Sequence, residues 1–365
     1  MNELTKITAI AEGRKSASAT TEVPVIDVDP LLHGGAADRE KVAEQIGAAA
    51  RSVGFFYVAN HGVDGDLIRR AYDQAATFFS LPLEKKLKSY IAESRNHRGY
   101  VPVTERGTYV DEGSERLYEA FDSGLDLPLH EVPAVGSCLM GPNVWPGVAG
   151  FRESATEYFR AASQFGQRLL GAFEMHLELP SGYFGEFMTR PTSQLRFLHY
   201  LENEPPVEDN DMNMGAHTDY ECFTVLHQTS PGLQVLAQDG QWIDAPPIAD
   251  TFIINIGDML EVWTNGAFRS TMHRVVNNGR ERFSMPLFMA ANYDAVIRPV
   301  STMVSKTNPR RYSSLVAGHH LMGQLLRDFA YLKARHDANQ LQLDFEVPDG
   351  NPFELSKLLA VEQAA

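Results

Sequence analysis

Two residues of the stretch GAHTDYECF (215–223), His217 and Asp219, have side chains that bind metal ions, and a single residue separates them. In a β-strand, the side chains of residues i and i+2 lie on the same face. If this stretch begins a strand, as its composition indicates, the imidazole and the carboxylate lie side by side. Such a pair fits a metal site, and it also fits an ordinary surface hydrogen bond.

A third candidate ligand, His273, occurs much later in the chain, in the apolar stretch STMHRVV. Two histidines and one carboxylate can fill one face of an octahedral non-haem Fe(II) site and leave the other positions open for O2 and a cosubstrate. Zinc enzymes also use two histidines and a carboxylate, so the ligand set alone leaves the metal undecided. Considered alone, His273 also fits a histidine at a strand end that bonds to backbone.

The sequence RFS follows His273 and places Arg282 and Ser284 two residues apart in a predicted strand. A guanidinium group binds a carboxylate through two parallel hydrogen bonds, and a nearby hydroxyl can add a third. A carboxylate site beside a metal with open positions indicates an α-keto acid, whose keto and adjacent carboxylate oxygens chelate iron. Considered alone, Arg282 fits a surface ion pair equally well.

The composition sets limits on the class of protein. The chain has 365 residues, of which 44% are hydrophobic and 22% charged, as in globular proteins. A formal net charge of −15 argues against a nucleic-acid partner or an anionic membrane surface. The two cysteines lack CxxC spacing, which excludes a disulfide framework and favours a reducing compartment. Because no signal peptide or membrane span is recognisable, we expect a cytoplasmic protein.

The elements that must position these residues follow from hydrophobic periodicity. Residues 1–22 are predicted to be a disordered tail. Residues 23–147 are predicted to be a mixed α/β region, with strands at 23–32 and 55–63, helices at 36–54 and 64–80, and an irregular segment at 92–147.

The second half of the chain has a different pattern. Residues 148–190 contain a predicted amphipathic helix (151–179) that packs on the core. Short apolar runs with Gly, Pro, Asn and Asp between them fill residues 191–300, which is typical of a β-sandwich or barrel. Residues 301–365 are predicted to be a C-terminal helical segment. The fold class is therefore mainly β with flanking helices.

From about residue 23 to residue 300, the chain resembles the isopenicillin N synthase-like branch of the Fe(II)/2-oxoglutarate-dependent dioxygenases. The stretches that carry the resemblance include VPVIDVDPL, GFFYVANHGV, NVWP, LRFLHY, GAHTDYECFTVLHQ, FIINIGDMLEVWTNGAFRSTMHRVV and RFSMPLF. The resemblance implies a distorted double-stranded β-helix (jelly roll) core. It also implies that His217, Asp219 and His273 bind Fe(II), and that Arg282, Ser284 and Tyr200 bind 2-oxoglutarate.

The implied function is an enzyme that couples oxidative decarboxylation of 2-oxoglutarate, to succinate and CO2, to hydroxylation or desaturation of a small molecule. O2 is the second cosubstrate, and no residue beyond the metal ligands is required as a general base. The alternatives are a same-scaffold Fe(II) oxidase that does not use 2-oxoglutarate, an ethylene-forming enzyme, and a non-catalytic binding module. The substrate and the oligomeric state stay open.

Candidate pocket residues come from stretches next to the motifs. They are Arg98, Tyr100, Tyr220, Glu221, Phe223 and Phe288. Glu221 could bind a substrate amine and Arg98 a substrate carboxylate, while plain core packing is the alternative for Phe223 and Phe288. The charged segment at 106–122 could contribute to specificity or simply be solvated. The pair His319–His320 is predicted to be exposed or to cap a helix.

Overall fold

The computed structural model describes residues 22–105, 118–133, 136, 138–202, 212–341, 343, 345–348, 350, 351 and 353. The predicted tail at 1–22, apart from its last residue, and residues 106–117 of the charged segment lie outside this part of the chain. None of the helices in the described part is long and apolar enough to cross a membrane.

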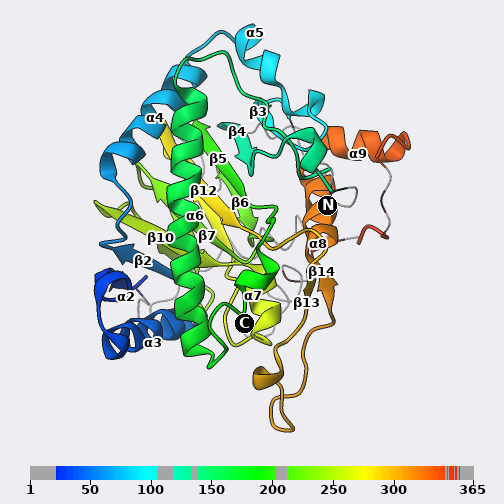
Figure 1. Ribbon diagram of the computed structural model, residues 1–365. Helices are drawn as coiled ribbons and strands as arrows, with labels where there is room; N and C mark the ends of the chain where they lie inside the picture. Colours follow the sequence, from blue (N-terminus) through cyan, green and yellow to red (C-terminus); the bar gives the residue numbers. More distant parts are fainter. Residues whose placement is uncertain are drawn as a thin grey trace.

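The core contains an eight-stranded sheet assembled from distant parts of the chain (Figure 1). Its order is β1 (Val25–Asp27), β2 (Phe55–Ala59), β10 (Thr251–Ile256), β7 (Phe223–Gln228), β12 (Arg282–Met289), β5 (Gln194–Tyr200), β4 (Tyr118–Gly124) and β3 (Gly99–Val101). Only β1 and β2 are parallel neighbours among these described strands. The central strands β10 and β7 are rich in β-branched and aromatic residues, which are favoured in strands.

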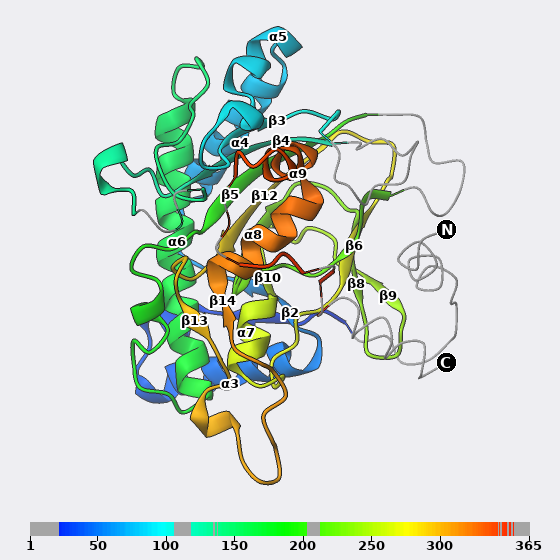
Figure 2. The same ribbon diagram turned by 90° about the vertical axis from the view of Figure 1, so that its right-hand side faces the viewer.

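A smaller antiparallel sheet completes the core. Its order is β6 (Met212–His217), β11 (His273–Val276), β8 (Leu233–Leu236) and β9 (Trp242–Asp244). Figure 2 shows it beside the large sheet, and a separate hairpin pairs β13 (Val296–Ile297) with β14 (Leu315–Val316). A mainly antiparallel core of two sheets with helices outside is the jelly-roll architecture that the resemblance implied.

Helices surround this core, and the longest, α6, crosses the outer face of the large sheet (Figure 1). The helices are α2 (Asp29–His33), α3 (Ala36–Ser52), α4 (Gly65–Phe79), α5 (Leu83–Lys86), α6 (Phe151–His176), α7 (Asp258–Trp263), α8 (Ala317–Asp328) and α9 (Ala330–Asp337), with 3-10 turns at Leu87–Ser89, Ile91–Glu93, Leu129–Glu131, Gly185–Phe187 and Ser301–Met303. The buried side chains of α6 recur at helical spacing, so that one stripe faces the sheet.

Several elements differ from the expectation. The first strand ends at Asp27, because Pro30 fits the first turn of α2, where its missing N–H is not needed. The segment at 92–147 contains β3 and β4 as well as loops, and β4 pairs with β5 along its whole length. The C-terminal helical pattern divides into α8 and α9 at Phe329, whose backbone is extended.

The strand register assigns side chains of the large sheet to two faces. Phe223 and its cross-strand partner Met289 contact α6 through Phe173 and Gly166, so they lie on the outer face. The next pair, Thr224 and Phe288, points to the opposite, inner face because side chains alternate along a strand. The inner face is the one that meets the candidate site.

Candidate active site

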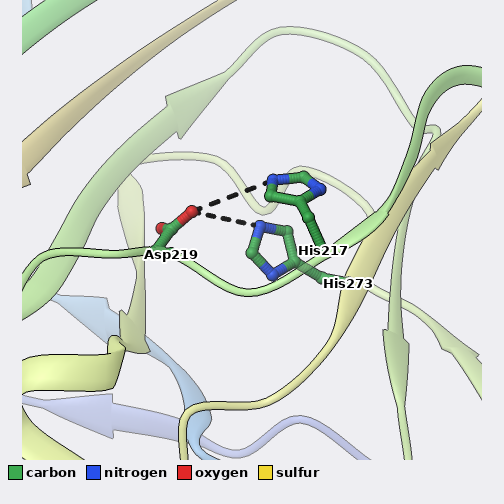
Figure 3. Close-up of side chains that lie close together, drawn as sticks. All are labelled: His217, Asp219 and His273. Carbon is green, nitrogen blue, oxygen red and sulfur yellow. Dashed lines mark ion pairs between the residues drawn. The ribbon is translucent and has the colours of Figure 1, made fainter. Parts of the chain in front are cut away.

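His217 and His273 are brought together by strand pairing. His217 is the last residue of β6, His273 is the first residue of β11, and the two are direct cross-strand partners with ring centroids 4.2 Å apart. Asp219 approaches both rings from the loop after β6 (Figure 3). One ligand atom from each of the three residues lies within 4.8 Å of the others.

The hydrogen bonds of the two imidazoles decide which nitrogen faces the centre. His217 Nδ1 lies 2.8 Å from the Gly215 carbonyl, and His273 Nδ1 lies 3.2 Å from the Thr271 carbonyl. A carbonyl only accepts, so each Nδ1 carries the proton and each Nε2 keeps a lone pair. Burial, and less strongly the neighbouring His217, lower the pKa of His273 to about 4, which keeps this ring neutral and able to bind a metal at neutral pH.

The two carboxylate oxygens of Asp219 have different partners. Its Oδ1 lies 3.8 Å from His217 Nε2 and 3.5 Å from His273 Nε2. Its Oδ2 accepts hydrogen bonds from Thr224 Oγ1 and, at 2.6 Å, from Asn255 Nδ2. These two donors come from the inner face of β7 and β10 and fix the orientation of the carboxylate.

The position of Asp219 corrects the strand argument made from the sequence. Because β6 ends at His217, alternation within a strand does not place Asp219 beside it. A backbone hydrogen bond holds the loop in place instead: the Asp219 carbonyl accepts from the Asp258 amide at 2.9 Å. The proximity that the sequence predicted is therefore confirmed, but its cause is tertiary.

The donor set fits a divalent metal ion with open positions. Two neutral imidazole nitrogens and one carboxylate oxygen converge from one side, and no fourth His, Cys, Asp or Glu of the described residues joins the group. This is the donor set of non-haem Fe(II) oxygenases. His273 and Asp219 are buried, and the side chain of His217 is 23% exposed, so the ligand group is closed on one side and reachable on the other.

The predicted carboxylate-binding residues form a second group on the inner face of the large sheet. Arg282 of β12 pairs with Tyr200 of β5, and its guanidinium carbon lies 4.3 Å from the centre of that tyrosine ring. Ser284, two residues further along β12, shares their face. The structure thus brings all three residues together.

Arg282 is buried without an anionic partner. Only 2% of it is exposed, its Nη1 donates to the Pro231 carbonyl at 3.3 Å, and its Nε has no hydrogen-bond partner. Among the described residues, no carboxylate forms an ion pair with it. Because a buried cation is costly unless it is paired, the arrangement fits a ligand that brings its own carboxylate. Burial also lowers the pKa of Arg282 from its ordinary value.

The guanidinium of Arg282 occupies space that is free because Gly232 has no side chain. A Cβ at this glycine would lie 2.2 Å from Arg282 Nη1, and the backbone φ of +142° is one that other residues rarely adopt. The guanidinium is therefore held between this turn and the Tyr200 ring.

Three of the predicted pocket residues lie near the site. Phe288 is a partly exposed inner-face residue next to Thr224, which contacts Asp219. Tyr220 lies in the ligand loop and donates from its hydroxyl to Asp328 of α8 at 2.9 Å. Glu221 is 7% exposed, and burial, with a smaller effect of Asp219, raises the pKa of its carboxyl to about 8.

The other three predicted pocket residues lie elsewhere. Phe223 packs on α6 from the outer face. The Tyr100 hydroxyl donates to Glu119, which also binds Lys86 and His199 behind the sheet. Arg98 is 1% exposed and donates to backbone carbonyls, among them that of Leu139 at 2.8 Å. Phe223 and Tyr100 therefore face away from the metal ligands, and the guanidinium of Arg98 is engaged by backbone carbonyls, so none of the three is assigned to the pocket.

His320 also differs from its prediction as an exposed or capping residue. Its side chain is 6% exposed, and its Nε2 lies 3.3 Å from Asp258 Oδ2. The periodicity of α8 gave no sign of this, because the partner is 62 positions away in sequence.

Thr224 and Asn255 were not predicted from the sequence. For Asn255 the sequence contains one signal, since its amide interrupts the apolar stretch TFIINI. In the structure, this residue is 2% exposed. A buried polar side chain in a strand requires a hydrogen-bond partner, and here the partner is a metal ligand.

Replacing Asn255 with alanine should weaken metal binding without removing it. Loss of its hydrogen bond frees the Asp219 carboxylate to rotate, and outer partners of metal ligands are typically worth about 10- to 100-fold in metal affinity or activity. Titration of the apo-protein with Fe(II) or Co(II) measures the change. An unchanged affinity would show that Thr224 alone is sufficient to orient Asp219.

Comparisons with known proteins identify the family of the chain. Residues 23–147 match the family model for the non-haem dioxygenase in morphine synthesis N-terminal region, and residues 192–291 match the 2OG-Fe(II) oxygenase superfamily. The chain is 34% identical over 328 residues to a homoarginine-6-hydroxylase of Arabidopsis thaliana, which covers 85% of this chain and 90% of that protein. It is 31% identical to a 2-oxoglutarate-Fe(II) type oxidoreductase of Emericella nidulans, covering 87% of this chain and 93% of the relative.

Solved structures give the same result. The crystal structure of a full-length Neurospora crassa protein in complex with alpha-KG superposes with a TM-score of 0.73 at 27% identity, covering 85% of this chain and 99% of that one. A 2OG-Fe(II) oxygenase family protein from Caulobacter crescentus gives a TM-score of 0.74 at 30% identity, covering 84% and 99%. With these matches and a converging group of two histidines and an aspartate, the chain belongs to the 2OG-Fe(II) oxygenase superfamily and is a 2-oxoglutarate-dependent dioxygenase.

Proposed function

We propose that His217, Asp219 and His273 hold Fe(II), and that Arg282, Ser284 and Tyr200 bind the distal carboxylate of 2-oxoglutarate. The observation that carries the second assignment is the buried, unpaired guanidinium of Arg282. When bound, iron and 2-oxoglutarate would supply the oxidising chemistry with O2 as the oxidant. One oxygen atom would go into succinate, with release of CO2, and the other into the hydroxyl group formed from a C–H bond of a small molecule.

The protein's own side chains contribute binding and orientation. The outer hydrogen bonds from Thr224 and Asn255 fix the Asp219 carboxylate. Arg282 offers its Nε and the rest of its fork to a carboxylate, while the Tyr200 ring covers one side of the guanidinium. No other side chain is needed as a general base in this assignment.

For the substrate, we propose a small molecule with a cationic nitrogen group, an ammonium or a guanidinium, that pairs with Glu221. This carboxylate is buried in the loop that carries Asp219, and among the described residues no other side chain donates a hydrogen bond to it. With its pKa raised to about 8, this carboxyl is largely protonated at neutral pH without a partner, and a bound cationic group would favour its ionised form. Similarity to the homoarginine-6-hydroxylases, whose named substrate carries a guanidinium, supports this class.

Two partly exposed side chains complete the proposed pocket. Phe288 and Arg196 lie on the inner face of the large sheet, on neighbouring strands. Arg196 forms a bidentate ion pair with Asp122, at 2.7 and 2.8 Å, so its charge is already balanced. Phe288 offers an apolar wall for the aliphatic part of a substrate.

The cytoplasmic location stays a prediction from the sequence.

A substrate screen with a matched variant tests the cationic class. L-Homoarginine, L-arginine and L-lysine should each stimulate succinate formation more than neutral thymine does. For the responding amino acid, Glu221→Gln should raise KM by about 30-fold or more, the effect of losing about 2 kcal/mol from a buried charge pair. Glu186→Gln, at an exposed position, is the control.

The outcomes separate the substrate class from the reaction. Turnover of thymine but of none of the cationic compounds would exclude the cationic class, and an unchanged KM in Glu221→Gln would exclude Glu221 as the partner of the substrate. Either result leaves the dioxygenase assignment intact. Substrate-independent conversion of 2-oxoglutarate to succinate reports on that assignment separately.

A further inference from the structure

The loop that carries Asp219 is bound to the first turn of α7. Successive amides of Gly257, Asp258 and Met259 donate to the carbonyls of Cys222, Asp219 and Glu221 at 2.9, 2.9 and 3.1 Å. The approach is close, because a Cβ at Gly257 would lie 2.3 Å from the Glu221 carbonyl oxygen. The path of the ligand loop therefore depends on where α7 lies.

The side chain of Asp258 connects α7 to three other segments. This carboxylate is fully buried and accepts hydrogen bonds from Ser270 Oγ at 2.7 Å and Asn351 Nδ2 at 3.2 Å, and it lies 3.3 Å from His320 Nε2. Ser270 belongs to the segment that leads into His273. Asp258 thus joins the two ligand-bearing segments to α8 and to the C-terminal end of the described chain.

Asn351 contacts the metal-binding motif itself. It is 1% exposed, and its Nδ2 donates to Thr218 Oγ1 at 3.2 Å as well as to Asp258. Thr218, which is fully buried, is the residue between the ligands His217 and Asp219. The two hydrogens of one amide nitrogen therefore link the ligand loop to Asp258.

The residues around Asn351 keep it in place. Its Oδ1 accepts a hydrogen bond from the Phe353 amide at 3.0 Å, and the Phe353 ring stacks on Tyr312 and lies edge-on to His320. A segment more than 130 positions beyond the ligand loop is thus fixed against it. Figure 2 shows α8, which carries His320, lying close to α7.

We propose that Asn351 and Asp258 are positioning residues of the metal centre, through which the C-terminal segment holds the His217–Asp219 loop in its metal-binding geometry. This inference rests on the proposed iron ligands. Metal affinity depends steeply on ligand placement, because a ligand set must be held within a fraction of an ångström by its surroundings. A contact with Thr218 acts on both flanking ligands at once.

The test is a titration of the apo full-length protein with Co(II) without oxygen, followed by its visible absorption bands. Asn351→Ala should weaken Co(II) binding about tenfold, at the lower end of what outer partners of metal ligands contribute, and should change the band intensities. Thr218→Val keeps the side-chain shape and removes the acceptor, and it should give a similar loss. The double variant should bind no more weakly than the weaker single variant.

The matched control is Glu346→Gln, an exposed position in the same C-terminal segment. A purely structural role of Asn351 would lower the melting temperature of the apo-protein and leave the Co(II) affinity and spectrum as in the control, which would overturn the proposal. If Asn351→Ala does not fold, Thr218→Val alone decides: wild-type Co(II) binding by that variant would also overturn it. A wild-type protein that binds no Co(II) would instead refute the metal site itself.

Discussion

Asp219→Ala should lose metal binding and turnover together while keeping the fold. The substitution removes the only carboxylate of the donor set and leaves two neutral imidazoles to hold a divalent ion. It also leaves the Thr224 hydroxyl and the Asn255 amide without their acceptor, at a cost of about 1–3 kcal/mol for each unsatisfied group. That cost is less than the roughly 5–15 kcal/mol that stabilises a typical domain.

Two measurements check this result. Metal content after reconstitution with Fe(II) should fall to background, and succinate formation from 2-oxoglutarate should be undetectable, while the circular dichroism spectrum stays that of the wild type. Asp294→Ala, at an exposed turn, is the control that should retain full activity. An Asp219→Ala protein that still forms succinate at the wild-type rate would contradict the assignment of this residue as a ligand.

Arg282→Leu should raise the apparent Kd for 2-oxoglutarate by about 30-fold or more. Removing one partner of a buried, hydrogen-bonded charge pair costs about 2–5 kcal/mol, and each 1.4 kcal/mol is about tenfold in affinity. Arg282→Lys should recover part of the affinity, because it keeps the charge and loses the planar fork that binds a carboxylate twice. Neither change affects the three metal ligands, so Fe(II) binding should be retained.

Anaerobic titration of the Fe(II)-loaded proteins with 2-oxoglutarate measures this effect through the visible metal-to-ligand charge-transfer band. The band should saturate in the wild type and in the exposed control Arg280→Leu, and should require far more 2-oxoglutarate in Arg282→Leu. If all three proteins show equal affinity, the carboxylate binds elsewhere. The absence of a band in the iron-loaded wild type would favour an oxidase that does not use 2-oxoglutarate.

The sequence alone determined the residue types of the site and the class of the fold. Three features can be recognised in the sequence whatever conformation the intervening loops adopt: the HxD pair, the later histidine and the RFS stretch. Short apolar runs with turn residues between them likewise specify strands, because alternation and turn chemistry act over a few residues. For this reason the mainly β core and the metal-binding group could be predicted without coordinates.

The tertiary structure decided which side chains share a face. Phe223 lies close to Asp219 in sequence, which made it a candidate for the pocket. The strand register nevertheless directs its side chain onto α6, whereas the side chain of Phe288 faces inward. Tyr100 faces the Glu119 network because of its pairing in β3 and β4. Shifting the register by one residue would exchange these faces, and no local pattern specifies the register between strands that are distant in sequence.

The tertiary structure also decided how Asp219 reaches the histidines. The sequence placed it in a strand, whereas it lies in a loop held by amides at the start of α7 and by donors from β7 and β10. The contacts of Asp219 join segments separated by 5 to 39 positions, and Asn351 adds one to Thr218 across 133. Hydrogen bonds of this kind depend on three-dimensional packing, so the sequence could name the ligand but not the groups that orient it.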